Sequence, residues 1–158
     1  AVDLKKRNDG EHTYSTKNNL DSAIKYFEEY YRLSSKIEHH EGLIDAPKGL
    51  GNCYLEIEKY DDALQLLEKS AQRAMEFKNI PAKVEAFSQI VKTHILKGGA
   101  DNGESYKKYF DEIINISKDK PKNKKINNIR VDLMEFIENL EQKSKIKEAN
   151  RFKRLYEE

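Results

Sequence analysis

The amino-acid sequence predicts an all-α fold, a right-handed solenoid of about three and a half helical hairpins. Apolar side chains recur with a helical period along most of the 158 residues, and strand-like alternation is almost absent. The apolar face that starts at Leu20 recurs in the face that starts at Tyr60, which gives a 40-residue period. Because one helical hairpin cannot bury its apolar face alone, this repeat predicts helix pairs that stack on one another.

The first helices follow a polar segment. Residues 1–17 are predicted to form an extended lead-in to a repeat domain of residues 18–158. The helix near Leu20 has no partner before it, so the first pair lacks its first helix, and we expect further repeats to precede the chain. Asp45 is expected to cap the second helix, with Pro47 in the first turn, where a missing N–H is harmless.

The later helices have start and stop signals of their own. Asn79 and Pro81 are expected to start a fourth helix, and a glycine cluster ends it. A fifth helix follows an N-cap at Asp101 or Asn102. After the last proline two further helices are expected, which makes seven in all. Their apolar positions are Ile126, Ile129, Leu133, Phe136 and Leu140, then Ile146, Ala149, Phe152 and Leu155.

The composition excludes several classes of function. Lys and Arg number 29 against 28 Asp and Glu, and the pI is about 7.9, so a dedicated nucleic-acid or membrane-surface protein is not expected. The mean hydropathy is −0.90, and no apolar run approaches the ~20 residues that span a bilayer. Cys53 is the single cysteine, which excludes an internal disulfide and fits a reducing, cytoplasmic compartment.

No residue pattern predicts catalysis, a cofactor or a metal site. His39 and His40 are adjacent on a helix, about 100° apart, so they cannot bind one metal as an i, i+4 pair would. His94 stands on an apolar face, and Cys53 has no histidine at a suggestive spacing. Both are therefore expected to be packing residues.

One stretch of the chain carries the pattern of a known repeat. Leu50, Gly51, Tyr54, Tyr60 and Ala63 stand at the spacing at which the tetratricopeptide repeat places its Leu-Gly, Tyr, second Tyr and Ala. The chain resembles this family over its whole helical part. The resemblance implies that Gly51 and Ala63 lie where the two helices of a pair cross. The 40-residue period further resembles a long-repeat subgroup that includes kinesin light chains, LGN-type adaptors and cilium-associated proteins.

The resemblance also implies a concave groove, lined by the first helix of each pair, that binds an extended or helical peptide. The exposed groove positions of the best-matching repeat and, by the 40-residue shift, of the next are Asp45, Lys48, Asn52, Glu85, Ser88 and Lys92. Lys48 and Asn52 resemble part of the clamp with which chaperone-binding members grip a C-terminal carboxylate. That clamp is incomplete here, because Gln89 stands near the place of its second Asn and Glu135 near that of a required basic residue.

A run of lysines occupies one predicted loop between helices. Its members are Lys118, Lys120, Lys122, Lys124 and Lys125, interrupted among charged residues only by Asp119. The run can contact an acidic partner, such as a tubulin-like surface or a phosphate backbone, or it can be a solvated loop, expected at the edge of the stack and far from the groove. The helix after it alternates apolar spacings of three and four like a coiled-coil seam, but over barely two heptads, which favours a solenoid core.

The sequence therefore predicts a non-catalytic scaffold that binds protein partners through a peptide or an acidic surface, without nucleic acid, membrane or cofactor. A cytoskeletal or axonemal (ciliary) assembly in the cytoplasm is the narrower expectation. A general cytosolic peptide-binding adaptor or co-chaperone is the alternative. An enzyme is the third class, and a bound cofactor or metal in the purified protein would favour it.

Overall fold

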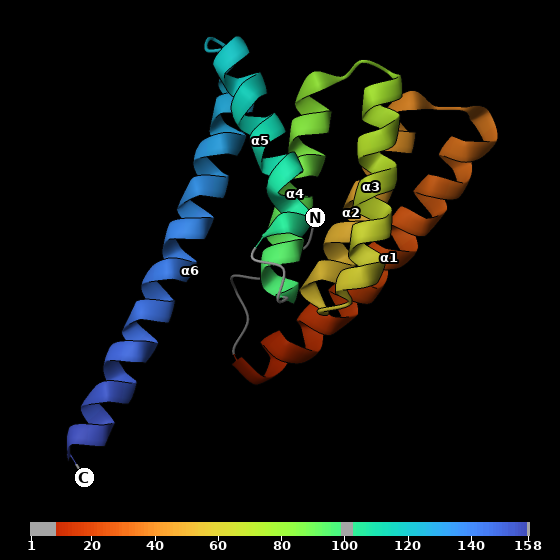
Figure 1. The fold of residues 1–158 in the computed structure, drawn as a ribbon. Helices are drawn as coiled ribbons and strands as arrows, with labels where there is room; N and C mark the ends of the chain where they lie inside the picture. The colour runs from red at the N-terminus through yellow and green to blue at the C-terminus, as the bar shows by residue number, and fades with distance from the viewer. Residues whose placement is uncertain (1–8, 99–102, 158) are drawn as a thin grey trace.

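Six α-helices make up the part of the chain that the computed structural model describes, which for the backbone is residues 9–98 and 103–157. Side chains are described for residues 18–98 and 103–144 and for residues 153 and 155. The helices are α1 (Asp9–Ile37), α2 (His40–Glu56), α3 (Tyr60–Glu76), α4 (Ile80–Lys97), α5 (Glu104–Asp119) and α6 (Lys124–Glu157). They alternate in direction along the chain (Figure 1). The predicted all-α fold of stacked helical hairpins is confirmed.

The helices form two rows. α2 packs against α4, and α4 packs against α6, in addition to the contacts of each helix with its neighbours in the chain. Among the described residues, α1, α3 and α5 do not pack against one another. The even-numbered helices therefore line the inner side of the stack, here called the concave face, and the odd-numbered helices lie outside it.

Three turns between helices repeat the same geometry at a regular spacing. Glu38, Glu58 and Lys78 each have a left-handed backbone, with φ of 52°, 61° and 56°. One backbone hydrogen bond, the six-residue bond of a Schellman motif, closes each turn at 2.8–2.9 Å. It joins the N–H of His39 to the carbonyl of Ser34, that of Lys59 to Tyr54 and that of Asn79 to Ala74. Each helix with its turn makes up half of the predicted 40-residue period.

The predicted start of α2 is wrong. α2 begins at His40 after an N-cap at His39, so Asp45 and Pro47 lie inside the helix. Pro47 is fully buried there, and it cannot supply the N–H that would normally bond to the carbonyl of Leu43. The start of α2 follows the regular spacing of the turns at Glu38, Glu58 and Lys78. The local start signals of Asp45 and Pro47 do not determine it.

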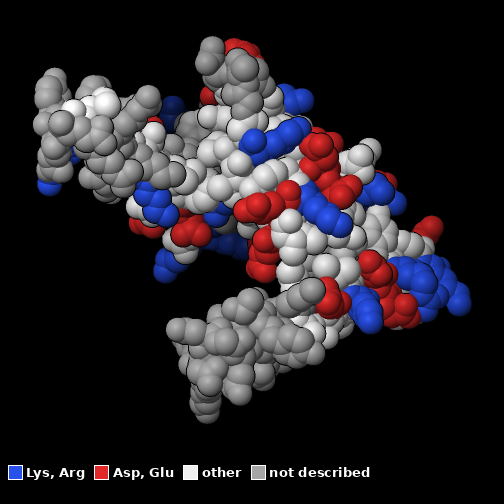
Figure 2. Space-filling view, turned by 90° about the horizontal axis from the view of Figure 1, so that it is seen from below, with Lys and Arg blue, Asp and Glu red and all other residues white. Residues whose placement is uncertain are grey.

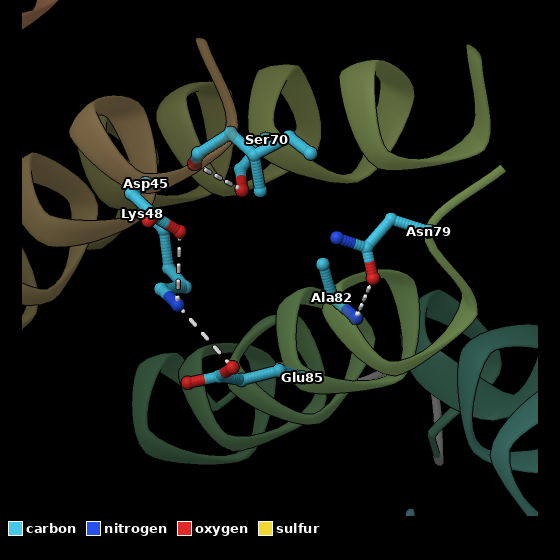
Figure 3. A network of polar contacts seen from close by, with 7 residues as sticks. Asp45, Lys48, Ser70, Asn79, Ala82 and Glu85 are labelled. Carbon is cyan, nitrogen blue, oxygen red and sulfur yellow. Dashed lines mark hydrogen bonds and ion pairs between the residues drawn. The ribbon is translucent and has the colours of Figure 1, made fainter. Parts of the chain in front are cut away.

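The predicted start of α4 is confirmed. The side-chain Oδ1 of Asn79 accepts a hydrogen bond of 3.1 Å from the N–H of Ala82 (Figure 3). Such a cap satisfies one of the free N–H groups of the first turn. For α5, the predicted caps Asp101 and Asn102 lie outside the described residues, and the N-cap is Gly103.

Both ends of the described chain differ from the expectation. α1 begins at Asp9, so it includes residues 9–17 of the predicted polar lead-in, while residues 1–8 lie outside the described residues. The last two predicted helices are one, because α6 is continuous over 34 residues, or about 50 Å. No Gly or Pro interrupts residues 124–157, and the helix runs well past α5 (Figure 1).

The hydrophobic core follows most of the predicted apolar faces. One cluster joins α3 to α6, and its buried members are Leu64, Leu67, Ala71, Val84, Ala86, Phe87, Ile90, Val91, Ile113, Ile126 and Leu133. A smaller cluster of Ile44, Ala74 and Ala82 joins α2, α3 and α4. Ile126 and Leu133 place the first half of α6 in the solenoid core. Ile37, in the predicted apolar face that starts at Leu20, is 72% exposed, because it is the last residue of α1, at the turn.

Small residues lie at the closest helix crossings. Gly51 and Ala63 meet between α2 and α3, as predicted: a Cβ on Gly51 would stand 3.0 Å from Cγ of Leu67 and 3.3 Å from the carbonyl oxygen of Ala63. A second crossing, between α1 and α2, was not predicted. There a Cβ on Gly42 would overlap the side chain of Ser34.

The turn geometry predicts a stabilising substitution. Lys78→Gly is expected to raise the free energy of unfolding by about 0.5–1 kcal/mol, because glycine adopts the left-handed conformation without the Cβ penalty. Urea denaturation measures the change. Lys69→Gly, at an exposed position inside α3, is the matched control and is expected to lose about 1 kcal/mol. A loss in both variants would contradict the assigned turn.

Candidate functional site

A lysine joins two helices of the concave face. Nζ of Lys48, on α2, lies 3.2 Å from a carboxylate oxygen of Glu85, on α4, and 3.6 Å from one of Asp45 (Figure 3). The side chains of Lys48, Glu85 and Asp45 are 19%, 32% and 40% exposed. The structure thus brings together three of the six predicted groove residues, and the lysine is the least accessible of them.

A depression of about 460 Å³ opens beside these ion pairs and is named the α2–α4 depression. Its lining residues are His40, Glu41, Ile44, Asp45, Lys48, Phe77, Asn79, Ala82, Glu85 and Lys125. Three of them are carboxylates and two are lysines, so acidic side chains outnumber basic ones by one. Acidic and basic side chains also intermingle over the face of the molecule shown in Figure 2.

The other three predicted groove residues lie elsewhere on α2 and α4. Nζ of Lys92 lies 5.5 Å from the ring centroid of Phe136 on α6, a cation–π contact. Oδ1 of Asn52 is buried and accepts no hydrogen bond from any described residue. Ser88 is only 4% exposed, so its prediction as an exposed groove residue is wrong. Ser88 lies on α4, and both α2 and α6 pack against that helix. Helical spacing alone does not show that these two helices cover it.

The predicted lysine patch is not one surface. Lys125 lines the α2–α4 depression, and Lys120 lines a different depression beside the start of α4. Lys118, Lys122 and Lys124 line a third, between α5 and α6. The expectation that the run lies far from the groove is therefore wrong for Lys125, because the start of α6 packs against α4.

Cys53 is a buried packing residue, and His40 is exposed but stacks on a neighbouring ring. Burial, and after it the carboxylate of Glu56, raises the pKa of the Cys53 thiol, so the thiol is protonated at neutral pH. The ring of His40 stacks on Phe77, with centroids 3.9 Å apart. In the described part of the chain, no three His, Cys, Asp or Glu side chains gather as a metal site would require. No helix there is long and apolar enough to cross a membrane.

The fold and this face define an α-helical repeat protein with an inner surface built from alternate helices. Residues 12–76, which include most of α1 and all of α2 and α3, match the family model of the tetratricopeptide repeat. The match contains Leu50, Gly51, Tyr54, Tyr60 and Ala63, and it supports the family inferred from them. Tetratricopeptide repeats generally mediate protein–protein interaction and are not catalytic. No curated protein and no solved structure matches the chain.

Sequence reasoning missed several members of the α2–α4 depression. With α2 taken to start at Asp45, Glu41 fell outside the helix. The helix start at His40 puts Glu41, Asp45 and Lys48 at i, i+4 and i+7 on one face. The 40-residue period could have indicated the true start of α2. Shifted back by 40 residues, the N-cap of α4 at Asn79 falls on His39, which is the N-cap of α2. The stacking of His40 on Phe77 had no signal in the sequence.

A double-mutant cycle on Lys48→Met and Glu85→Gln is expected to give a coupling free energy of about 0.5–1 kcal/mol, because both side chains are partly buried. Urea denaturation of the two single variants, the double variant and wild type measures it. The control cycle is Lys97→Met with Asp61→Asn, a 2.7 Å pair whose side chains are 44% and 78% exposed. Its coupling is expected to be near zero. A larger coupling in the control than at Lys48 would contradict this account.

Proposed function

We propose that the chain is a non-catalytic scaffold whose concave face binds an extended segment of a protein partner. α2, α4 and α6 present adjacent surfaces on one side of the stack. The observation that carries the proposal is the α2–α4 depression, where charged side chains of two helices meet around Ile44 and Ala82. A pocket with a few convergent polar groups of this kind is suited to positioning a bound chain.

The charges of this depression favour a basic side chain on the partner. Lys48 already has two carboxylate neighbours, so it is poorly placed to grip a C-terminal carboxylate. Glu41 lines the same depression and adds a third carboxylate, against the two lysines Lys48 and Lys125. A Lys or Arg of the partner would compensate this charge. The geometry therefore supports an adaptor that binds a basic side chain of its partner. It disfavours the chaperone-type clamp, which binds a C-terminal carboxylate.

Asn52 can hold the backbone of the bound segment. It lies one helical turn after Lys48 on α2, so a chain that crosses the depression along α2 would reach it next. Its amide has two donors and one acceptor, the groups that pair with a peptide backbone.

Peptides selected from a random phage-displayed library against the full chain test this proposal. We expect the selected peptides to contain a Lys or Arg. The double variant Asp45→Asn, Glu85→Gln is expected to bind them about tenfold more weakly, with a flatter salt dependence, because it removes two compensating charges. Fluorescence anisotropy of a labelled peptide gives the dissociation constants.

The matched control is Asp62→Asn with Glu68→Gln, which removes two exposed carboxylates from the outer helix α3. Its affinity is expected to stay within about twofold of wild type. Equal weakening by both double variants would show an effect of net charge alone. Unchanged binding by the concave-face variant, with an unchanged circular dichroism spectrum, would place the interface on another surface.

The narrower assignment to a cytoskeletal or axonemal assembly is also a proposal. Its supports are the 40-residue period and the lysines Lys118, Lys122 and Lys124 that line one depression and could contact an acidic filament. A general cytosolic adaptor or co-chaperone is the alternative.

Co-sedimentation with polymerised tubulin separates these two roles. A filament scaffold is expected to enter the pellet at low salt and, in a smaller fraction, at physiological salt, because surface attraction is screened over about 8 Å there. The variant with Gln at Lys118, Lys120, Lys122 and Lys124 is expected to stay in the supernatant. A wild-type chain that never enters the pellet would favour the adaptor.

A further inference from the structure

A depression of about 580 Å³ lies between the end of α5 and the start of α6 and is named the α5–α6 pocket. Its lining residues are Ile114, Ser117, Lys118, Pro121, Lys122, Lys124, Asn127, Asn128 and Arg130. Four of these nine residues are cations, and none is a carboxylate. The pocket shares no residue with the α2–α4 depression.

The four cations differ from the lysines at the contacts between helices. Lys48, Lys83 and Lys97 lie 3.2, 3.1 and 2.7 Å from carboxylate oxygens of other helices. By contrast, no described carboxylate forms an ion pair with any of the four cations of the α5–α6 pocket. The pocket lining is therefore positively charged, with no described carboxylate in an ion pair with it, and it favours an anionic ligand.

The loop between α5 and α6, which carries Lys122 and joins the helices of the other three cations, is held in place by internal hydrogen bonds. The side-chain Nδ2 of Asn127 donates to the carbonyl oxygens of Pro121 and Asn123, at 3.0 and 2.8 Å. Oδ1 of Asn123 in turn accepts a 3.1 Å hydrogen bond from the N–H of Ile126, whose side chain is fully buried. A loop fixed in this way loses little conformational entropy when a ligand binds.

We propose that the α5–α6 pocket binds a phosphoryl group carried by a Ser or Thr of a partner protein. A phosphomonoester has a charge of about −1.5 to −2 at neutral pH and three acceptor oxygens, so it can satisfy several cations at once. Arg130 supplies a planar fork for two of the oxygens, and the lysines supply point charges. Ile114 and Pro121 form an apolar wall for the residue beside the phosphate.

The test is a titration of the ¹⁵N-labelled full chain with the blocked tripeptide acetyl-Gly-phosphoSer-Gly-amide, followed by NMR at constant ionic strength. The comparison peptides contain Ser or Glu in the central position. We expect saturable shifts of the backbone amides of residues 114–130. The affinity for the phosphotripeptide is expected to be at least about tenfold higher than for the Glu tripeptide.

Two variants keep the test independent of folding. One replaces the exposed Lys118, Lys122 and Lys124 with Gln, and the other is Arg130→Gln, at a partly buried position. Each is expected to lower the affinity for the phosphotripeptide by about tenfold or more. The matched control replaces three exposed lysines elsewhere, Lys36, Lys69 and Lys107, with Gln. Its affinity is expected to stay within about twofold of wild type.

Three outcomes would overturn the proposal. Equal affinities for the phosphorylated and Glu tripeptides would reduce the pocket to a general acid-binding patch. Equal losses in the pocket and control triple variants would show an effect of net charge alone. Binding to phosphatidylserine vesicles without any response to the phosphotripeptide would assign the pocket to a lipid surface. None of these outcomes bears on the concave face, which is tested with its own peptides.

Discussion

The close approach of α2 to both of its neighbours is the constraint on which the rest of the structure depends. On one side a Cβ on Gly42 would overlap the side chain of Ser34 of α1, and on the other a Cβ on Gly51 would stand only 3.0 Å from Cγ of Leu67 of α3. Larger residues would push the helix axes apart and move α2 relative to α4. The 3.2 Å bridge from Lys48 to Glu85 depends on this placement of α2 beside α4.

The turns keep this packing in register. Helix starts fall at His40, Tyr60 and Ile80, and the same spacing returns at Glu104 and Lys124 after a longer connection. The backbone strain of the three non-glycine turns, about 1–2 kcal/mol each, is offset by their hydrogen bonds and by the packing of the helices that they join. Because the connection before α5 is longer, the 40-residue shift relates α2 to α4 but does not carry α4 onto α6.

The net charge of +1 conceals two different electrostatic environments. Where helices pack side by side, lysines such as Lys48 and Lys83 pair with carboxylates of the next helix, and these pairs neutralise the surface. At the short connection between α5 and α6 no described carboxylate pairs with the cations, and the charge stays available to a ligand. The helical stack therefore has two charged surfaces. Carboxylates outnumber lysines in the α2–α4 depression, and cations line the α5–α6 pocket.

The sequence by itself determined the all-α fold and the 40-residue period, because helical periodicity is a local property of the chain, and its resemblance to the tetratricopeptide repeat predicted the crossing at Gly51 and Ala63. It misplaced the start of α2, because Asp45 and Pro47 imitate the signal of a helix start. Only the tertiary structure decided that Ser88 is buried and that the lysine run divides between separate depressions. Both depend on which helices lie beside α4 and α6, and that packing joins residues far apart in the chain, beyond the reach of any local pattern.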